Sequence, residues 1–276
     1  LDLSTEEGGL VPSKVGGGGQ TNSLRAHDRH GGVWAIRSTT KDSGRLLPYP
    51  ISTLTPARRL LDHAFTATHP EAALAVPRLA EAAGVMHLSP RLMYLPDQDA
   101  LGRWRGFVGD EVVMVEQRPH ALDDGPLPAR LGGDASFKAY DEMAEKLLAH
   151  PEKHRVDQEA MLRCRLLAVL IGDWDRHRGQ WRFAVTDDEA GGKRYTPIPL
   201  DRDQAFANYD GLGLAIGRVI VAQARSLQPF TGAYGPIGWL NYNARDFDAA
   251  MLNGLPRERW RAIAAELEAA ITDAVI

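Results

Sequence analysis

Two acidic motifs, separated by one predicted β-hairpin, constrain the fold of this chain most strongly. The first, IGDWDRHRGQW at residues 171–181, follows an apolar stretch with helical spacing, and the second, PIPLDRDQAF at residues 197–206, begins with a short extended run. Side chains at the ends of a helix and of a strand are held by rigid elements. Because chance rarely places two such motifs on either side of one hairpin, we expect them to form one site that holds metal and phosphate.

The C-terminal half is predicted to be mostly helical around that hairpin. Helices are expected where apolar residues recur at helical spacing, and strands where short apolar runs end in polar turns. The expected elements are strands at residues 181–185 and 195–200 and helices at residues 137–149, 157–171 and 256–276. Asp157 is the expected N-cap of the second helix, and the last helix is expected to be scaffold.

The N-terminal part is predicted to be a small antiparallel meander, followed by helices and two more strands. The expected elements are extended segments at residues 10–11, 22–26 and 33–37, helices beginning at Pro56 and at Pro70, and strands at residues 91–95 and 111–115. A stretch rich in proline and glycine, residues 123–133, follows them. We therefore expect an α+β chain with an N-lobe at residues 9–119 and a C-lobe at residues 120–276.

Composition and charge exclude several classes of protein. The 276 residues include 32 basic and 36 acidic side chains, a formal net charge of −4, so no overall basic field favours nucleic acid. The longest apolar stretch, residues 166–171, is far shorter than the roughly 20 residues that cross a bilayer. A single cysteine, Cys164, excludes an internal disulfide and a cysteine-rich zinc site. The chain begins at Leu1 without a signal peptide, so we expect a fragment or a processed form.

Phosphoryl transfer requires a cradle for phosphates, a cation on their oxygens, a carboxylate near the attacking hydroxyl, and hard oxygen ligands for a metal. A glycine run between two extended segments is the candidate cradle, because backbone N–H groups can approach a phosphate where side chains are absent. Its residues are Gly16, Gly17, Gly18, Gly19, Gln20 and Thr21. The alternative for this run is a flexible hairpin or linker.

The candidate phosphate anchor is a cation at the end of the strand predicted at residues 33–37. Arg37 ends that strand, and Lys41 lies four residues further on, so either side chain is a candidate. A solvated strand end is the alternative for both. Glu71 and Glu81 on the neighbouring predicted helix are candidate ion-pair partners of this cation, with Glu81 favoured.

The first acidic motif supplies the candidate base. Asp175 follows the apolar helix and precedes Arg176 and His177, so its carboxylate is expected to accept the proton of the substrate. Oxygen ligands for a metal are offered by three residues: Gln180, Asp201 and Asp203. His177 is an alternative metal ligand, although a lone histidine beside an arginine is more often structural or faces phosphate. A capped, salt-bridged loop is the alternative for the whole cluster.

The pattern Gly172-Asp-Trp-Asp-Arg-His177, with an amide at position 180 and Asp201 after an apolar strand, resembles the atypical protein-kinase-like superfamily. This group includes phosphatidylinositol kinases, HipA-type toxin kinases, CotH spore-coat kinases and secreted Golgi casein kinases. The resemblance implies a two-lobed fold with a small antiparallel N-lobe and a mostly helical C-lobe. It also implies ATP, or another nucleoside triphosphate, and Mg²⁺ or Mn²⁺ as cofactors.

The same resemblance implies roles for individual residues. Asp175 would be the base, and Gln180 and Asp201 would hold the metal. The residues implied around the nucleotide are Gly16 to Gly19 as its loop, Arg37 as the phosphate anchor, and Glu116 to Arg118 as the hinge beside adenine. Two positions depart from the family pattern, because Gln180 replaces the usual asparagine and Arg37 the usual lysine, and arginine and lysine are not interchangeable at a point contact.

Residues 9–211 also resemble a module of large bacterial surface proteins, placed between a metallophosphoesterase and an outer-membrane barrel. This resemblance implies an extracytoplasmic location and fusion to other domains.

Three functions are left open by the sequence. The first is an ATP- and metal-dependent kinase or nucleotidyl transferase that acts on an acceptor the sequence does not identify. The second is a pseudokinase-like module that binds a ligand or partner without chemistry. The third is a metal-dependent phosphoesterase with a two-metal cluster drawn from Asp173, Asp175, His177, Asp201 and Asp203, which lacks the several histidines common in such sites.

Overall fold

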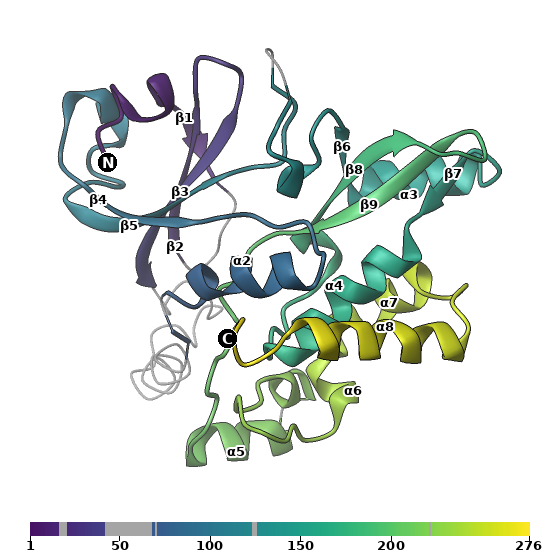
Figure 1. Cartoon of the computed structure of the whole chain (residues 1–276). Coiled ribbons are helices and arrows are strands. Elements are labelled where there is room, and N and C mark those ends of the chain that lie inside the picture. Colours follow the sequence, from purple (N-terminus) through teal and green to yellow (C-terminus); the bar gives the residue numbers. More distant parts are fainter. Residues whose placement is uncertain (17–20, 42–67, 70, 123–125, 221) are drawn as a thin grey trace.

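The computed structural model describes residues 1–16, 21–41, 68–69, 71–122, 126–220 and 222–276 (Figure 1). Several predictions lie outside these residues: the helix expected to begin at Pro56, and the placement of Gly17, Gly18, Gly19 and Gln20. The side chain of Lys41 is likewise outside them.

A five-stranded antiparallel sheet forms the N-terminal lobe, with strand order β1-β2-β3-β5-β4. Its strands are β1 (Val11–Val15), β2 (Thr21–His27), β3 (Val33–Lys41), β4 (Arg91–Leu95) and β5 (Glu111–Gln117). The predicted antiparallel meander is confirmed, because β1 pairs with β2 and β2 pairs with β3. The two later predicted strands complete the same sheet on the other edge of β3.

The two faces of this sheet differ in polarity. One face packs a core that includes Leu24, Ile36 and Val115. Because side chains alternate along a strand, Arg25 and Arg37 point to the opposite face. The register therefore directs a polar face of the sheet toward the rest of the molecule.

The predicted hairpin belongs to a second sheet, with strand order β6-β8-β9-β7. Its strands are β6 (Ser136–Ala139), β7 (His154–Val156), β8 (Trp181–Asp187) and β9 (Lys193–Pro199), and β7 runs parallel to β9. The pairing of β8 with β9 confirms the hairpin. The expectation of helix from residue 137 was wrong for three residues, because residues 136–139 pair with the edge of β8 and helix α3 (Tyr140–Ala149) begins after them.

Helix α4 (Gln158–Leu170) is the central helix of the C-terminal lobe. The side chain of Asp157 caps it as predicted, accepting a hydrogen bond from the Ala160 N–H at 3.0 Å. Met161, Leu162 and Leu167 lie in the largest core cluster. Helix α8 (Arg257–Ala270) packs beside α4, and it ends six residues before the predicted helix did.

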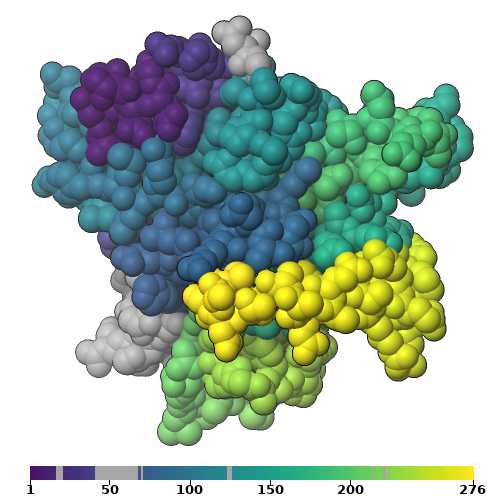
Figure 2. Space-filling view, in the orientation of Figure 1, coloured from purple at the N-terminus to yellow at the C-terminus, as the bar shows by residue number. Residues whose placement is uncertain are grey.

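Helix α2 (Ala72–Ala82) connects the lobes. It lies between β3 and β4 in sequence, yet Val76, Leu79 and Ala80 belong to the core cluster built around α4. Arg78 donates a hydrogen bond to the Ala274 carbonyl at 2.6 Å, and α2 lies against the C-terminal segment in the space-filling view (Figure 2). The helix predicted at residues 70–83 is therefore a contact between the N-terminal lobe and the helical half.

The C-terminal lobe also contains short helices that the sequence analysis did not predict: α5 (Leu212–Ile220), α6 (Ile237–Leu240) and α7 (Arg245–Met251). The expected α+β fold is confirmed, with an antiparallel sheet first and a mostly helical half after it. The domain bounds at residues 119 and 120 stay a prediction. In the part of the chain that the structure describes, no helix is both long and apolar enough to cross a bilayer.

Candidate functional site

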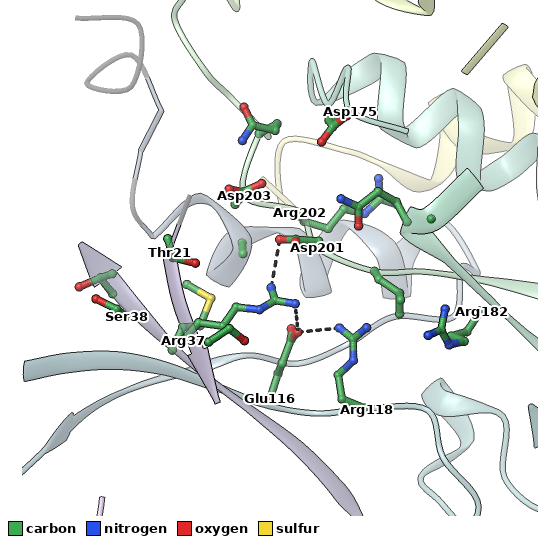
Figure 3. Close-up of a pocket in the computed structure, with 18 of the residues that line it drawn as sticks. Thr21, Arg37, Ser38, Glu116, Arg118, Asp175, Arg182, Asp201, Arg202 and Asp203 are labelled. Carbon is green, nitrogen blue, oxygen red and sulfur yellow. Dashed lines mark hydrogen bonds and ion pairs between the residues drawn. The ribbon is translucent and has the colours of Figure 1, made fainter. Parts of the chain in front are cut away.

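A cavity of about 550 Å³ lies between the polar face of the N-terminal sheet and the segments that carry the two acidic motifs (Figure 3). Strands β2, β3 and β5 form one wall, and residues 175–182 and 200–204 form the other. The predicted site residues that line it are Thr21, Arg37, Glu116, Asp175, His177, Gln180, Asp201 and Asp203. The structure thus brings most of the described candidates to one cavity.

A tight helix end delivers the first motif. Helix α4 stops at a Schellman motif: the Gly172 N–H donates to the Val169 carbonyl at 3.1 Å, and the Asp173 N–H donates to the Ala168 carbonyl at 2.8 Å. Gly172 has a φ of 69°, in the left-handed region. The chain therefore reverses direction at once, Asp173 becomes buried, and Asp175 reaches the cavity.

The second motif is held against the first by backbone bonds. The Leu200 N–H donates to the Gln180 carbonyl at 2.9 Å, which places Asp201 beside the residue that ends the first motif. Arg176 Nη1 donates to the Leu200 carbonyl at 2.7 Å, and Arg176 Nη2 donates to the Asp201 carbonyl. Asp201 itself adopts a left-handed φ of 50°. These bonds therefore hold Gln180 and Asp201 in a fixed position relative to each other.

Arg176, a predicted catalytic residue, lies behind the cavity wall. Its side chain is fully buried, with its Nε 3.1 Å from Asp173 Oδ2. Arg202 Nη1 donates to the same oxygen at 2.8 Å. A charge buried in this way requires its partner to stay in place, so Arg176 is a positioning residue that joins the two motifs.

Asp175 has the environment of a base. Burial raises the pKa of its carboxyl group, and the charges of His177 and Arg176 act in the opposite direction. His177 Nε2 lies 3.9 Å from Asp175 Oδ1, and Asn243 Nδ2 donates to the same oxygen at 3.4 Å. A carboxylate with a raised pKa takes up a proton more readily than an ordinary aspartate.

His177 lies at the start of a short 3₁₀ helix, residues 178–180. Its Nδ1 accepts a hydrogen bond from the Gly179 N–H at 3.1 Å, and its side chain is 48% exposed. One ring nitrogen thus caps local backbone and the other faces Asp175. The structure places His177 at the rim of the cavity, next to the candidate base.

Arg37 bridges the two lobes. Its Nη2 lies 3.1 Å from Glu116 Oε1, and its Nη1 donates to Asp201 Oδ1 at 3.0 Å (Figure 3). Burial disfavours the charged guanidinium, but the carboxylates of Glu116, Asp201 and Asp203 outweigh burial and raise the pKa of Arg37. Arg37 is thus a fixed cation in the centre of the cavity.

The expected ion pair between this cation and Glu81 was wrong. Glu81 is exposed on α2, because the helix turns Val76, Leu79 and Ala80 toward the core. Arg37 lies opposite Met114 in the β3–β5 register, and Glu116 lies two residues along β5 on the same face. The carboxylate that pairs with Arg37 is therefore that of Glu116, its diagonal neighbour on the adjacent strand. The apolar periodicity of one helix could not indicate a contact between strands.

The hinge expected at residues 116–118 is engaged in other contacts. The backbone N–H of Arg118 donates to the Val33 carbonyl at 2.7 Å, which extends the sheet. Its guanidinium Nη1 donates to Glu116 Oε1 at 3.0 Å. Burial lowers the pKa of Arg118 to about 10, and the nearby charge of Arg37 adds to this effect. This N–H is therefore not free to recognise a base.

Several cavity residues were given no role by the sequence analysis: Ser23, Arg25, Arg182 and Arg202. No sequence signal marked Arg25, because the pairing of Ser23 with Arg37 in the sheet sets the face on which Arg25 lies. Among the glycines, Gly16 donates its N–H to the Ser23 carbonyl at 2.6 Å, and a Cβ there would lie 2.4 Å from Ser23 Oγ. A side chain at position 16 would thus collide with β2.

The oxygen donors in the cavity suit a metal that also binds phosphate. Gln180, Asp201 and Asp203 all line the cavity. Among the described residues, no group of three histidine, cysteine, aspartate or glutamate side chains could hold a metal alone. Mg²⁺ commonly takes one or two carboxylates and completes its shell with substrate phosphates and water, and this donor set fits that chemistry.

No protein-family model matches the chain, and no curated protein matches it. Solved structures similar to it include two of Rio2 kinase from Chaetomium thermophilum, one of them a complex with ADP, Mg²⁺ and phosphoaspartate. Their sequence identities are 14% and 15%, their TM-scores 0.31 and 0.32, and the alignments cover 94% of this chain and 70% and 71% of those chains.

A third similar structure is that of the proinflammatory kinase CtkA from Helicobacter pylori. Its identity is 9% and its TM-score 0.30, with 92% of each chain covered. The fold is therefore described from the elements of this chain itself. The chain has a two-lobed α+β fold, in which Arg37 of the N-terminal sheet meets Asp201 of the helical half at one cavity.

Proposed function

We propose that this chain is a metal-dependent phosphotransferase of the kinase type, with ATP or another nucleoside triphosphate as the phosphoryl donor. The observation that carries this proposal is the convergence of Arg37 from the sheet with Asp175, Asp201 and Asp203 from the helical half on one cavity. These groups correspond to the phosphate cation, the base and the metal ligands that phosphoryl transfer requires. The acceptor is a hydroxyl-bearing molecule of unknown class.

Each residue has a role that follows from its place. Asp175 accepts the proton of the attacking hydroxyl, helped by its raised pKa. Gln180, Asp201 and Asp203 would hold Mg²⁺ or Mn²⁺, which neutralises charge on the phosphate oxygens. Arg37 contacts phosphate oxygens from the sheet side and keeps Glu116 as its own counter-ion.

The ion pair between Arg37 and Asp201 supports a second candidate function. Asp201 Oδ1 accepts a hydrogen bond from Arg37 at 3.0 Å, so a cationic side chain already contacts the principal candidate metal ligand. In a module that binds a ligand without chemistry, this pair would persist. In a phosphotransferase, metal and phosphate would replace it: the metal would take Asp201, and the phosphate would take Arg37.

The phosphoesterase alternative has less support. Its two-metal cluster would need Asp173, but that carboxylate is buried and bonded by Arg176 and Arg202. His177 Nδ1 already accepts a hydrogen bond from the Gly179 N–H. A two-metal hydrolytic site needs several free ligands within reach of both ions, which this arrangement does not offer.

A thermal-shift experiment tests the proposal. The purified chain is heated with ATP, with Mg²⁺ or Mn²⁺, and with both, beside the Asp201→Asn and Asp175→Asn variants. A ligand at 100 times its Kd stabilises by about 2.7 kcal/mol, which is readily measured. The phosphotransferase is supported if stabilisation needs both nucleotide and metal. Asp201→Asn should abolish this stabilisation, and Asp175→Asn should retain it.

Turnover then separates the two candidates. With radiolabelled ATP, transfer to protein, sugar or lipid acceptors, or autophosphorylation, should disappear in Asp175→Asn. Binding without any transfer supports the non-catalytic module, and stabilisation by metal alone supports the phosphoesterase. An extracytoplasmic location and fusion to further domains stay proposals that the chain's cellular fractionation would test.

A further inference from the structure

The charges along the cavity are partly separated. The carboxylates of Asp175, Asp201 and Asp203 lie toward one end, with Arg202 beside them, and Arg118 and Arg182 lie toward the other, with Arg37 and Glu116 between the two ends (Figure 3). Arg25 lines the same cavity, and the charges of both Arg37 and Arg182 act on it. We call Arg25, Arg118 and Arg182 the basic cluster. A cavity with two ends of opposite charge suits a ligand, or two ligands, with matching charges.

Arg25 lacks a counter-ion for part of its guanidinium. Its Nη1 is buried and makes no hydrogen bond to any residue in the described part of the chain. Burial lowers the pKa of Arg25, and the neighbouring charges of Arg37 and Arg182 lower it further. A buried guanidinium N–H without an acceptor is costly, so the positive charge of Arg25 is incompletely balanced within the protein.

The other two arginines share few acceptors. Glu116 Oε1 accepts from Arg118 at 3.0 Å and also lies 3.1 Å from Arg37, so one carboxylate oxygen serves two cations. Arg182 Nη1 donates to the carbonyl of its own neighbour Trp181 at 3.0 Å. The side chain of Arg118 is 10% exposed, so water does little to solvate its charge. The basic cluster therefore carries more positive charge than Glu116 balances.

The chemistry of this end favours an oxyanion over a neutral ring. Strand β2, the residue that follows β5, and strand β8 present three guanidinium groups here. Guanidinium matches phosphate geometry with paired N–H donors. The backbone N–H of Arg118, which could otherwise recognise a base, is bonded to Val33. Among the residues that the structure describes, the apolar side chains that line the cavity are those of Ala73, Met114 and Leu200.

We propose that the basic cluster is an anion subsite that binds a phosphoryl group without a metal, separate from the acidic end where Asp201 and Asp203 would bind one. This inference goes beyond the proposed phosphotransfer, because the subsite needs neither metal nor reaction. It predicts that the physiological ligand, or a second ligand bound beside it, carries a phosphoryl group at the sheet end of the cavity.

Inorganic pyrophosphate is a suitable probe, because it is multiply charged and lacks a base. Its binding is measured by calorimetry in EDTA, at low and at high salt, to wild type and to Arg25→Gln and Arg182→Gln. Wild type should bind, and each variant should bind about ten-fold more weakly or worse, because a charge-assisted bond to phosphate is lost. Affinity should fall with added salt.

Two controls separate this inference from other causes. Arg245→Gln removes the same charge at a side chain that is 67% exposed on α7, and it should leave binding unchanged. Asp201→Asn should retain metal-free pyrophosphate binding, even though it should abolish metal-dependent nucleotide binding. The two proposals can therefore fail separately. Pyrophosphate binding in EDTA tests the anion subsite, and metal-dependent nucleotide binding tests the phosphotransferase.

Stability distinguishes a ligand site from a structural role. Arg25→Gln removes a half-buried charge whose Nη1 makes no hydrogen bond to a described residue, so its Tm without ligand should equal or exceed that of wild type while pyrophosphate affinity falls. A lower Tm with unchanged affinity would overturn the proposal, as would the absence of wild-type binding in EDTA. Competition by metal-free ATP would assign the subsite to the phosphates of the nucleotide, and simultaneous binding would assign it to a second ligand; both support the subsite.

Discussion

At the scale of single residues, Gly172 and Arg176 decide where the first acidic motif lies. Gly172 reverses the chain at the end of α4, and Arg176 then ties that turn to the backbone of Leu200 and Asp201. Neither residue needs to touch a substrate to matter, because together they orient Asp175 and Asp201.

Gly172→Ala is expected to destabilise the fold by about 1 kcal/mol or more, since alanine is strained at positive φ. A Cβ at this position would also lie 2.9 Å from Tyr234 Oη. Urea denaturation measures the change in the free energy of unfolding. Gly238→Ala is the matched control, because a Cβ there meets nothing within 4 Å. Equal stability of the two variants would contradict the role given to Gly172.

The raised pKa of Asp175 predicts that the stability of the fold depends on pH. Burial raises the pKa of its carboxyl above the unfolded value, so the folded state favours the protonated form. This contribution to stability is present below the unfolded pKa, near 4, and is lost as the pH rises through the raised value. Asp175→Asn should therefore raise the Tm near pH 7 more than at pH 3 to 4. The same Tm difference at every pH, measured against exposed Asp99→Asn, would refute this.

At the scale of elements, the register between β3 and β5 builds the electrostatic centre of the cavity. It sets Arg37 opposite Met114 and diagonal to Glu116, so a cation and its carboxylate share one face of the sheet. A shift of the register by one residue would turn Glu116 into the apolar core on the other face.

Glu116→Gln should destabilise the chain by about 3 kcal/mol, because it leaves Arg37 and Arg118 buried without the carboxylate that both contact. Chemical denaturation measures this cost. Glu81→Gln, on the exposed surface of α2, should change stability by no more than about 0.5 kcal/mol. The double variant Glu116→Gln/Arg37→Gln should recover part of the loss, and strict additivity would show that the two side chains are not coupled.

At the scale of the whole molecule, the two lobes meet through the cavity and through α2. Arg37 of the sheet bonds Asp201 of the helical half, and α2 packs into the core around α4. Ligand in the cavity would therefore act on the contact between the lobes as well as on the site.

Arg37→Lys tests this contact. Lysine is a point charge and cannot reproduce a planar fork that contacts Glu116 and Asp201 together, so one contact should be lost. We expect a lower Tm without ligand, by about 2 to 4 °C for each 1 kcal/mol lost, and a larger stabilisation by Mg²⁺ with ATP, because Asp201 becomes available. A metal response no larger than that of wild type would contradict competition between Arg37 and the metal.

Local signals in the sequence were enough to determine most elements and half of the site. The cap at Asp157, the alternation along β2 to β5 and the turn between β8 and β9 are encoded within short segments, so periodicity and turn chemistry predicted them. The two acidic motifs also marked the helical half of the cavity. Short helices such as α6 and α7 have four and seven residues, too few for a periodic pattern to mark them, which is why they were missed.

Only the tertiary structure decided which charges meet. Pairing between strands brought Glu116 to Arg37 in place of Glu81, and it set Ser23 opposite Arg37, which fixed the face on which Arg25 lies. Close packing of the two motifs buried Arg176 behind the cavity. Contacts of this kind join residues far apart in the chain, and their energies depend on burial and on neighbouring charges. The sequence by itself therefore determined most elements, the acidic end of the cavity and the cation Arg37, and the packing decided which carboxylates Arg37 meets and which further arginines join it.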